Sequence, residues 1–177
     1  MRQLLRKAVK QSYPQELLVK KMVNVGEKAP EMELVDSDKK MVKLSEYKGK
    51  PAVLLFYPGA FTGVCTKEMC SFRDSLSKYN QLGVSVLGIS VDSPFANMGF
   101  KTANNINFPL LSDYSRKTIK DYDIELQNFS GLNGYVSAKR AVYVLDKDHI
   151  VRYKWVGDSP AIEPDYNAVA MAAEKVK

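Results

Sequence analysis

The sequence predicts one α/β domain in which a central mixed β-sheet carries helices on both faces. Residues 51–57 form a short, continuous apolar run flanked by Gly and Pro, which is typical of a buried central strand. Apolar residues between Met69 and Leu82 recur at intervals of three and four, which is typical of a helix packed on one side. Two further strand-like runs, 140–146 and 150–156, are separated by a tight turn. With 177 residues, 45% of them hydrophobic, the chain is long enough to bury one core around such a sheet.

The remaining elements follow from the same periodicities. We expect them in this order: an N-terminal helix, short strands near 32–36 and 41–44, the 51–57 strand, a helix over 65–82, a strand over 84–91, a helix beginning near Pro94, a strand at 109–111, a helix near 115–121, the strands 140–146 and 150–156, and a helix from about 163. His149 falls in the turn between the last two strands, where a solvated side chain is expected.

The two cysteines are the residues most informative about function. Cys65 and Cys70 are the only cysteines, and Cys65 falls in the first turn of the predicted 65–82 helix. Backbone N–H groups without partners and the positive end of the helix dipole both favour a thiolate there. The competing interpretation is a small buried hydrophobic residue.

The spacing of the cysteines limits what they can do together. In an intact helix, residues five apart are separated by about 7.5 Å along the axis and point roughly 140° apart, so a disulfide requires the turn to unwind. The spacing suits a cycle in which Cys65 becomes a sulfenic acid and Cys70 condenses with it after local melting. Cys70 could equally be a buried residue of the helix face. The pattern differs from C-x-x-C dithiols and zinc sites, and His149 is the only histidine.

Several segments together resemble a known family. Pro58, Thr62 and Cys65 form P-x-x-x-T-x-x-C, and 65–74, 87–93, 107–113 and 139–146 are similar to family blocks in the expected order. The resemblance is to the peroxiredoxins, particularly the bacterioferritin comigratory protein, or peroxiredoxin Q, subgroup, and covers roughly residues 25 to 160. It implies a thioredoxin-like fold that reduces hydrogen peroxide and organic hydroperoxides without metal, haem or flavin.

The resemblance also implies roles for individual residues. Cys65 matches the peroxidatic cysteine, and the Thr62 hydroxyl would hydrogen-bond the peroxide. The Arg140 guanidinium would favour the thiolate and stabilise the charge that builds on the departing oxygen. Pro58 would shape the loop and screen the thiolate from water. Glu68 would orient Arg140 through a charge-assisted hydrogen bond, as structural support and not for proton transfer.

Each of these residues has a simpler explanation when taken alone. Arg140 could be a solvated cation at a strand end, Thr62 an ordinary N-cap and Pro58 a turn former. Glu68 could be a first-turn residue favoured by the helix dipole. Their joint occurrence around Cys65 at the family's spacing favours the functional interpretation.

The subgroup and the assembly depend on further positions. Cys70 matches the resolving cysteine of the Q type, although the 59–64 loop is closer to one-cysteine and type 5 peroxiredoxins. In related dimeric groups, loops near the site pack across a two-fold axis, and the corresponding apolar contacts here would be Phe61, Pro94 and Phe95. These residues predict a homodimer.

The formal charge of +6 is concentrated at the N-terminus. Residues 1–28 contain seven basic residues and two acidic ones, and apolar residues there recur at helical spacing. We therefore divide the chain into a basic helical arm, 1–24, and a peroxiredoxin-like domain, 25–177. The arm could pack on the body or a partner subunit, act as a transit peptide, or contact an anionic surface. We favour packing, and expect no nucleic-acid binding because no aromatic-basic cluster accompanies the charge.

The composition also bears on location and on the competing functions. No apolar stretch approaches 18 residues, so we expect neither membrane insertion nor export, and a cytoplasmic location. The leading hypothesis is a thiol peroxidase recycled by a thioredoxin-like or other thiol donor. The alternatives are a protein disulfide oxidoreductase, a one-cysteine peroxidase resolved by an external thiol, and a non-enzymatic holdase or structural oligomer with two buried cysteines.

Overall fold

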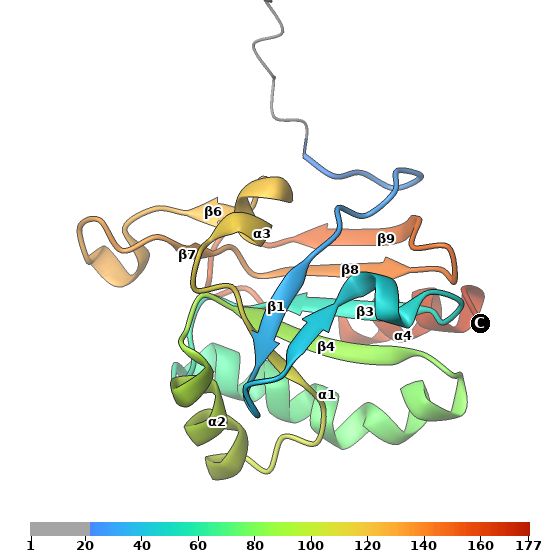
Figure 1. The fold of residues 1–177 in the computed structure, drawn as a ribbon, viewed down its shortest axis with the longest axis horizontal. Coiled ribbons are helices and arrows are strands. Elements are labelled where there is room, and N and C mark those ends of the chain that lie inside the picture. The colour runs from blue at the N-terminus through green and yellow to red at the C-terminus, as the bar shows by residue number, and fades with distance from the viewer. Residues whose placement is uncertain (1–21) are drawn as a thin grey trace, which may run out of the picture.

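The fold is built on a seven-stranded sheet, seen in a computed structural model that describes residues 22–177 (Figure 1). The strands lie in the order β2-β1-β5-β4-β3-β8-β9. Their bounds are β1 (Glu33–Asp36), β2 (Met41–Lys43), β3 (Ala52–Phe56), β4 (Ser85–Ser90), β5 (Leu110–Ser112), β8 (Ala141–Leu145) and β9 (Val151–Val156). β3 and β5 each run parallel to β4, and the other neighbours are antiparallel. The predicted mixed sheet is confirmed.

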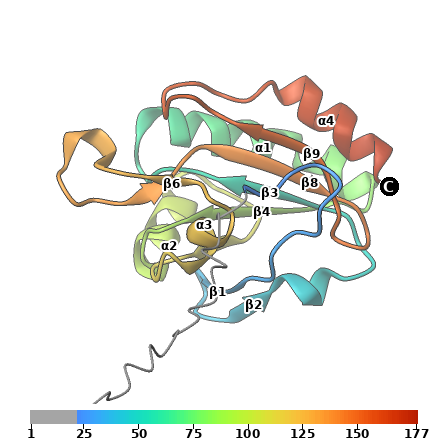
Figure 2. The same ribbon diagram turned by 90° about the horizontal axis from the view of Figure 1, so that it is seen from above.

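Helices cover both faces of this sheet. They are α1 (Gly63–Gln81), α2 (Pro94–Ala103), α3 (Lys117–Asp121) and α4 (Tyr166–Lys175). Figures 1 and 2 show α1 and α4 together on one face and α3 on the other. Every helix in the described part of the chain is too short or too polar to span a lipid bilayer.

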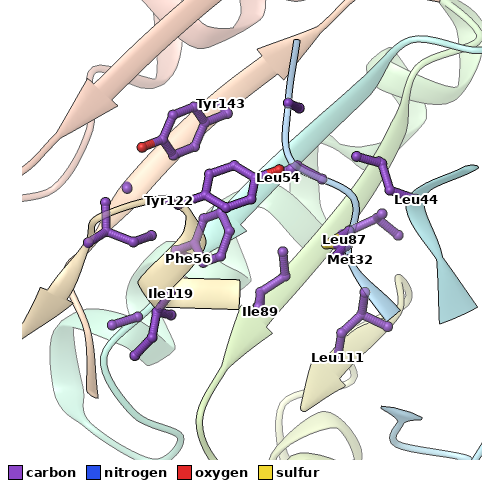
Figure 3. Close-up of a cluster of buried hydrophobic side chains, with 14 of the residues drawn as sticks. Met32, Leu44, Leu54, Phe56, Leu87, Ile89, Leu111, Ile119, Tyr122 and Tyr143 are labelled. Atoms are coloured by element: carbon purple, nitrogen blue, oxygen red, sulfur yellow. The ribbon is translucent and has the colours of Figure 1, made fainter. Parts of the chain in front are cut away.

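The continuous apolar run of β3 is explained by burial on both faces. Val53 and Leu55 join the side chains of α1 and α4 in one cluster, whereas Leu54 and Phe56 face the opposite cluster. Figure 3 shows the second cluster, in which Phe56 lies 5.1 Å from the Tyr122 ring. A strand covered on both faces needs apolar residues at every position, because successive side chains point to opposite sides.

The pairings of β3 bring distant parts of the chain to one edge of the sheet. Phe56, the last residue of β3, is paired with Ala141, the first residue of β8. The loop that leaves β3 and the residue that precedes β8 are therefore neighbours, although about 80 residues separate them in the sequence. This register places Arg140 beside the loop that leads to Cys65.

Some elements were not predicted. They are the 3₁₀ turns η1 (Leu44–Tyr47) and η2 (Phe129–Gly131) and the two-stranded ribbon of β6 (Glu125–Leu126) and β7 (Ser137–Ala138). The predicted arm, 1–24, lies outside the described residues except for 22–24, which carry no helix. The division of the chain at residue 25 stays a prediction.

The prediction for His149 was wrong. Its side chain is only 5% exposed, and its Nε2 is buried without a hydrogen-bond partner. The turn itself is as predicted, since the Asp146 carboxylate accepts from the backbone N–H groups of Asp148 and Ile150. The burial comes from a distant segment, because the N–H of Ala29 donates to the His149 carbonyl and closes over the turn.

Candidate active site around Cys65

Cys65 lies where the sequence predicts it, in the first turn of a helix. β3 ends at Phe56, a short loop follows, and α1 begins at Gly63 with Thr62 in the N-cap position. The Cys65 side chain is 1% exposed, and the thiol is free. The unpartnered N–H groups of a first helical turn and the helix dipole both favour negative charge on this sulfur.

Arg140 is the cation of the site. Its side chain is 1% exposed, and Nη2 donates to Cys65 Sγ at 3.3 Å. The same Nη2 donates to the carbonyl of Pro160 at 2.7 Å, and Nε also approaches that carbonyl, at 3.3 Å. Nη1 donates to Glu68 Oε2. Because these contacts hold the planar guanidinium from several sides, its donors stay directed at the sulfur. The simpler interpretation of Arg140 as a solvated cation at a strand end does not hold.

Glu68 lies one turn beyond Cys65 and forms a buried ion pair with Arg140. Its side chain has no exposed surface, and the second carboxylate oxygen, Oε1, has no hydrogen-bond partner. Burial raises the pKa of Glu68 more than the charge and hydrogen bond of Arg140 lower it, so that the net pKa is about 7. Burial alone would lower the pKa of Arg140, but Glu68 and Cys65 outweigh it and the net pKa is raised. The predicted contact between Glu68 and Arg140 is present.

The loop between β3 and α1 is held by its own polar contacts. Pro58 is buried, and the Thr62 hydroxyl donates to the carbonyl of Gly59 at 2.9 Å without capping the helix. The N–H of Ala60 donates to Asp92 Oδ2 at 2.8 Å. Asp92 follows β4, so it ties this loop to the adjacent parallel strand. Sequence reasoning did not single out Asp92, although it lies within one of the family-like blocks, 87–93.

A cavity of about 210 Å³ opens at the site. Its lining residues are Thr62, Gly63, Val64, Phe129, Ser130, Arg140, Pro160 and Ala161. Phe129 and Pro160 were not predicted. Pro160 contributes only a backbone carbonyl to Arg140, and Phe129 lies in η2, in the connection between β6 and β7, so neither leaves a sequence signal. Within residues 22–177, no group of three or more His, Cys, Asp or Glu side chains is placed to hold a metal ion.

Cys70 lies further along α1, away from the cavity lining. It is free and half-buried, and it packs against the cluster that contains Cys65, Met69 and Phe72. Residues 65 to 70 are all helical. A bond between the two sulfurs therefore requires this part of α1 to unwind.

Comparison with known proteins decides the family. The sequence pattern of the AhpC/TSA family matches residues 25–154. The chain belongs to the AhpC/TSA family. Among curated relatives, a chloroplastic peroxiredoxin Q from Triticum aestivum is 42% identical over 131 residues, which are 74% of this chain and 58% of the wheat protein. The putative peroxiredoxin bcp of Coxiella burnetii is 36% identical over 75% of this chain and 88% of that protein.

Solved structures share the fold of this chain. A peroxiredoxin-like protein from Aquifex aeolicus superimposes with a TM-score of 0.79 and 28% identity, covering 89% of this chain and 90% of that one. Peroxidoxin BcpB from Mycobacterium tuberculosis superimposes with a TM-score of 0.75 and 28% identity, covering 86% of this chain and 97% of that one. The resemblance to peroxiredoxins and the thioredoxin-like fold are confirmed. This chain spans 58% of the length of the first chloroplastic relatives it matches.

Of the predicted site residues, four come together around one sulfur. Arg140 contacts Cys65 and Glu68 directly, and Thr62 shares the cavity lining with Arg140. Pro58 lies buried at the start of the loop, and Cys70 stands apart. Such a site sets a fixed cation, which also lines the small cavity, beside a buried sulfur, an arrangement suited to nucleophilic attack that builds negative charge.

Proposed function

We propose that this AhpC/TSA protein is a thiol peroxidase that reduces hydrogen peroxide and organic hydroperoxides. The observation that carries the proposal is the 3.3 Å contact from Arg140 Nη2 to the Cys65 sulfur, inside a first helical turn. A guanidinium in this position stabilises a thiolate and offers donors to a polarised O–O bond.

The proposed chemistry has two steps. The Cys65 thiolate attacks one oxygen of ROOH, so that an S–O bond forms, the O–O bond breaks and the alkoxide leaves as ROH after taking a proton. The Cys70 sulfur then attacks the sulfenic acid, an S–S bond forms and the hydroxyl leaves as water. A thioredoxin-like or other dithiol donor reduces the disulfide.

Rapid mixing of the reduced protein with one equivalent of H₂O₂, followed by intact-mass analysis, tests this cycle. We expect an intramolecular disulfide in the wild type, a persistent sulfenate in Cys70→Ser and almost no fast reaction in Cys65→Ser. Loss of the fast reaction only in Cys70→Ser would reverse the two roles. A slow reaction in the wild type itself would remove the peroxidase proposal.

Two other enzymes would use the same thiols. A one-cysteine peroxidase would show wild-type sulfenate that only an added thiol removes. A protein disulfide oxidoreductase would reduce a protein disulfide such as that of insulin at a rate comparable with peroxide turnover, although it would normally use C-x-x-C.

We also propose a homodimer and a cytoplasmic location. Phe61 and Phe95 are 60% and 70% exposed, and the Phe61 ring packs edge-on against Phe100 of α2. Exposed aromatic side chains of this size are common at subunit contacts. Sedimentation at micromolar concentration tests the dimer, and a wild type that remains monomeric there would contradict it. Two unpaired thiols suit a reducing compartment, and imaging of the tagged full chain tests the location.

A further inference from the structure

A three-residue contact, which we call the clasp, joins α1 to the segment that follows β9. Lys67 Nζ lies 2.6 Å from Glu163 Oε1, and the Tyr166 hydroxyl donates to Glu163 Oε2 at 2.6 Å. Both oxygens of one carboxylate are therefore engaged, one by α1 and the other by the first residue of α4. These hydrogen bonds, with that from Lys67 first, lower the pKa of Glu163, so the carboxylate is charged at neutral pH.

The clasp acts on the part of α1 that must rearrange. Lys67 lies between Cys65 and Cys70, in the helical stretch that has to unwind before their sulfurs can meet. Tyr166 is anchored independently of Lys67, since its ring packs edge-on against Phe72 at 5.6 Å. When the turn opens, Lys67 must leave a carboxylate whose other contact stays in place.

The clasp is separate from the groups that meet the peroxide. Lys67, Glu163 and Tyr166 are absent from the cavity lining, and Lys67 is 70% exposed. Glu163 nevertheless lies three residues from Pro160, whose carbonyl holds the Arg140 guanidinium. Because Glu163 contacts α1 through Lys67, it can influence opening of the helix without contacting Cys65.

We propose that Glu163 is a positioning residue that holds α1 closed over residues 65–70 through Lys67, and thereby sets how fast Cys70 captures the oxidised Cys65. This inference rests on the proposed peroxidase cycle. Breaking the clasp makes opening easier, so the second step accelerates while the first is unchanged. A sulfenate captured sooner is also less exposed to a second H₂O₂, which would convert it to a sulfinic acid with release of water.

The test is stopped-flow oxidation of wild type, Glu163→Gln and Lys67→Met, following peroxide reaction and disulfide formation as separate phases. Exposed ion pairs contribute about 0.2–1 kcal/mol, so we expect disulfide formation to accelerate about 1.5- to 5-fold. The H₂O₂ concentration that gives half sulfinic acid should rise by a similar factor. Asp121→Asn is the matched control, because it removes one negative charge from the surface pair Lys117–Asp121 on α3 and should leave both phases unchanged.

The two variants also separate the clasp from a general charge effect. Glu163→Gln removes a negative charge and Lys67→Met a positive one, so an effect of net charge on the sulfurs would move the rates in opposite directions. The clasp predicts faster disulfide formation in both single variants, and no further acceleration when the two substitutions are combined.

An unchanged second phase in Glu163→Gln, opposite shifts in the two variants, or slowing of the peroxide phase in either would overturn the inference. The wild type is measured first. If it forms no intramolecular disulfide, the proposed cycle itself is wrong, whatever the variants show.

Discussion

Arg140→Ala tests the centre of the proposed site. The substitution removes the donor to the Cys65 sulfur, the contacts to the Pro160 carbonyl and the partner of the buried Glu68 carboxylate. A hydrogen bond to a charged group contributes about 1.5–3 kcal/mol. If that amount is lost from the transition state, the second-order rate with H₂O₂ falls about 10- to 150-fold.

The same substitution also destabilises the fold, so the experiment must separate lost stability from lost reactivity. Breaking a buried ion pair costs about 3–5 kcal/mol, against a total stability of about 5–15 kcal/mol. Without Arg140 only burial and like charge act on the pKa of Glu68, so its carboxyl must either take up a proton or stay buried as an unpaired charge. Glu68→Gln removes this titrating group, so Arg140→Ala/Glu68→Gln should be more stable than Arg140→Ala and equally slow. Arg152→Ala is the matched control, since Arg152 is 52% exposed in a surface pair with Asp146.

The chain contains a convenient reporter for this assay. Trp155 is the only tryptophan, and it packs against the cluster that contains Cys65. We expect its fluorescence to change with oxidation of Cys65 and so to follow the peroxide reaction by stopped flow; urea titration of the same samples gives the free energy of unfolding. A folded double variant that reacts with H₂O₂ as fast as the wild type would show that the guanidinium has no part in the chemistry.

Three further predictions follow from the same structure. Because burial raises the pKa of Glu68 from 4.5 to about 7, the folded state holds a proton between these pH values that the unfolded chain releases. The free energy of unfolding of the wild type should therefore decrease as the pH rises from about 4.5 to 7. Urea midpoints of Glu68→Gln should lack this decrease. Asp92→Ala removes the acceptor for the Ala60 N–H and should slow the peroxide phase about 2- to 10-fold. Asp92→Asn keeps an acceptor oxygen and should retain most of the wild-type rate. Equal rates in the wild type and both variants would show that this contact does not position the loop. A Cβ at Gly88 would lie 2.6 Å from Leu110 Cδ2, so Gly88→Ala should cost about 1–3 kcal/mol in thermal or urea unfolding, and an unchanged midpoint would mean that the core adjusts freely.

Local patterns were sufficient to predict most of the sheet and helices. The apolar run of β3 and the periodic face of α1 are encoded within their own segments, and α1 begins only two residues before the predicted start. Burial of His149 depends on a segment about 120 residues earlier in the chain, which no local pattern reveals. The short β6–β7 ribbon has too few residues for a periodicity to be seen.

The candidate site shows the same division between local and distant information. The position of Cys65 at a helix start follows from the sequence, and the resemblance to peroxiredoxins pointed to Arg140, Glu68 and Thr62. The acceptor that fixes Arg140 is a main-chain carbonyl at Pro160, which any residue type could supply. Side-chain identity therefore could not predict it.

The register of β3 against β8 has a practical consequence. Residues 130–134 form an exposed turn, and a cut there would leave β2, β1, β5, β4 and β3 on one fragment and β8 and β9 on the other. The thiol would belong to the first fragment and the guanidinium to the second. If the proposed peroxidase activity is present, peroxide consumption by a mixture of the two halves would report their reassembly, and the pair could serve as a split-enzyme sensor.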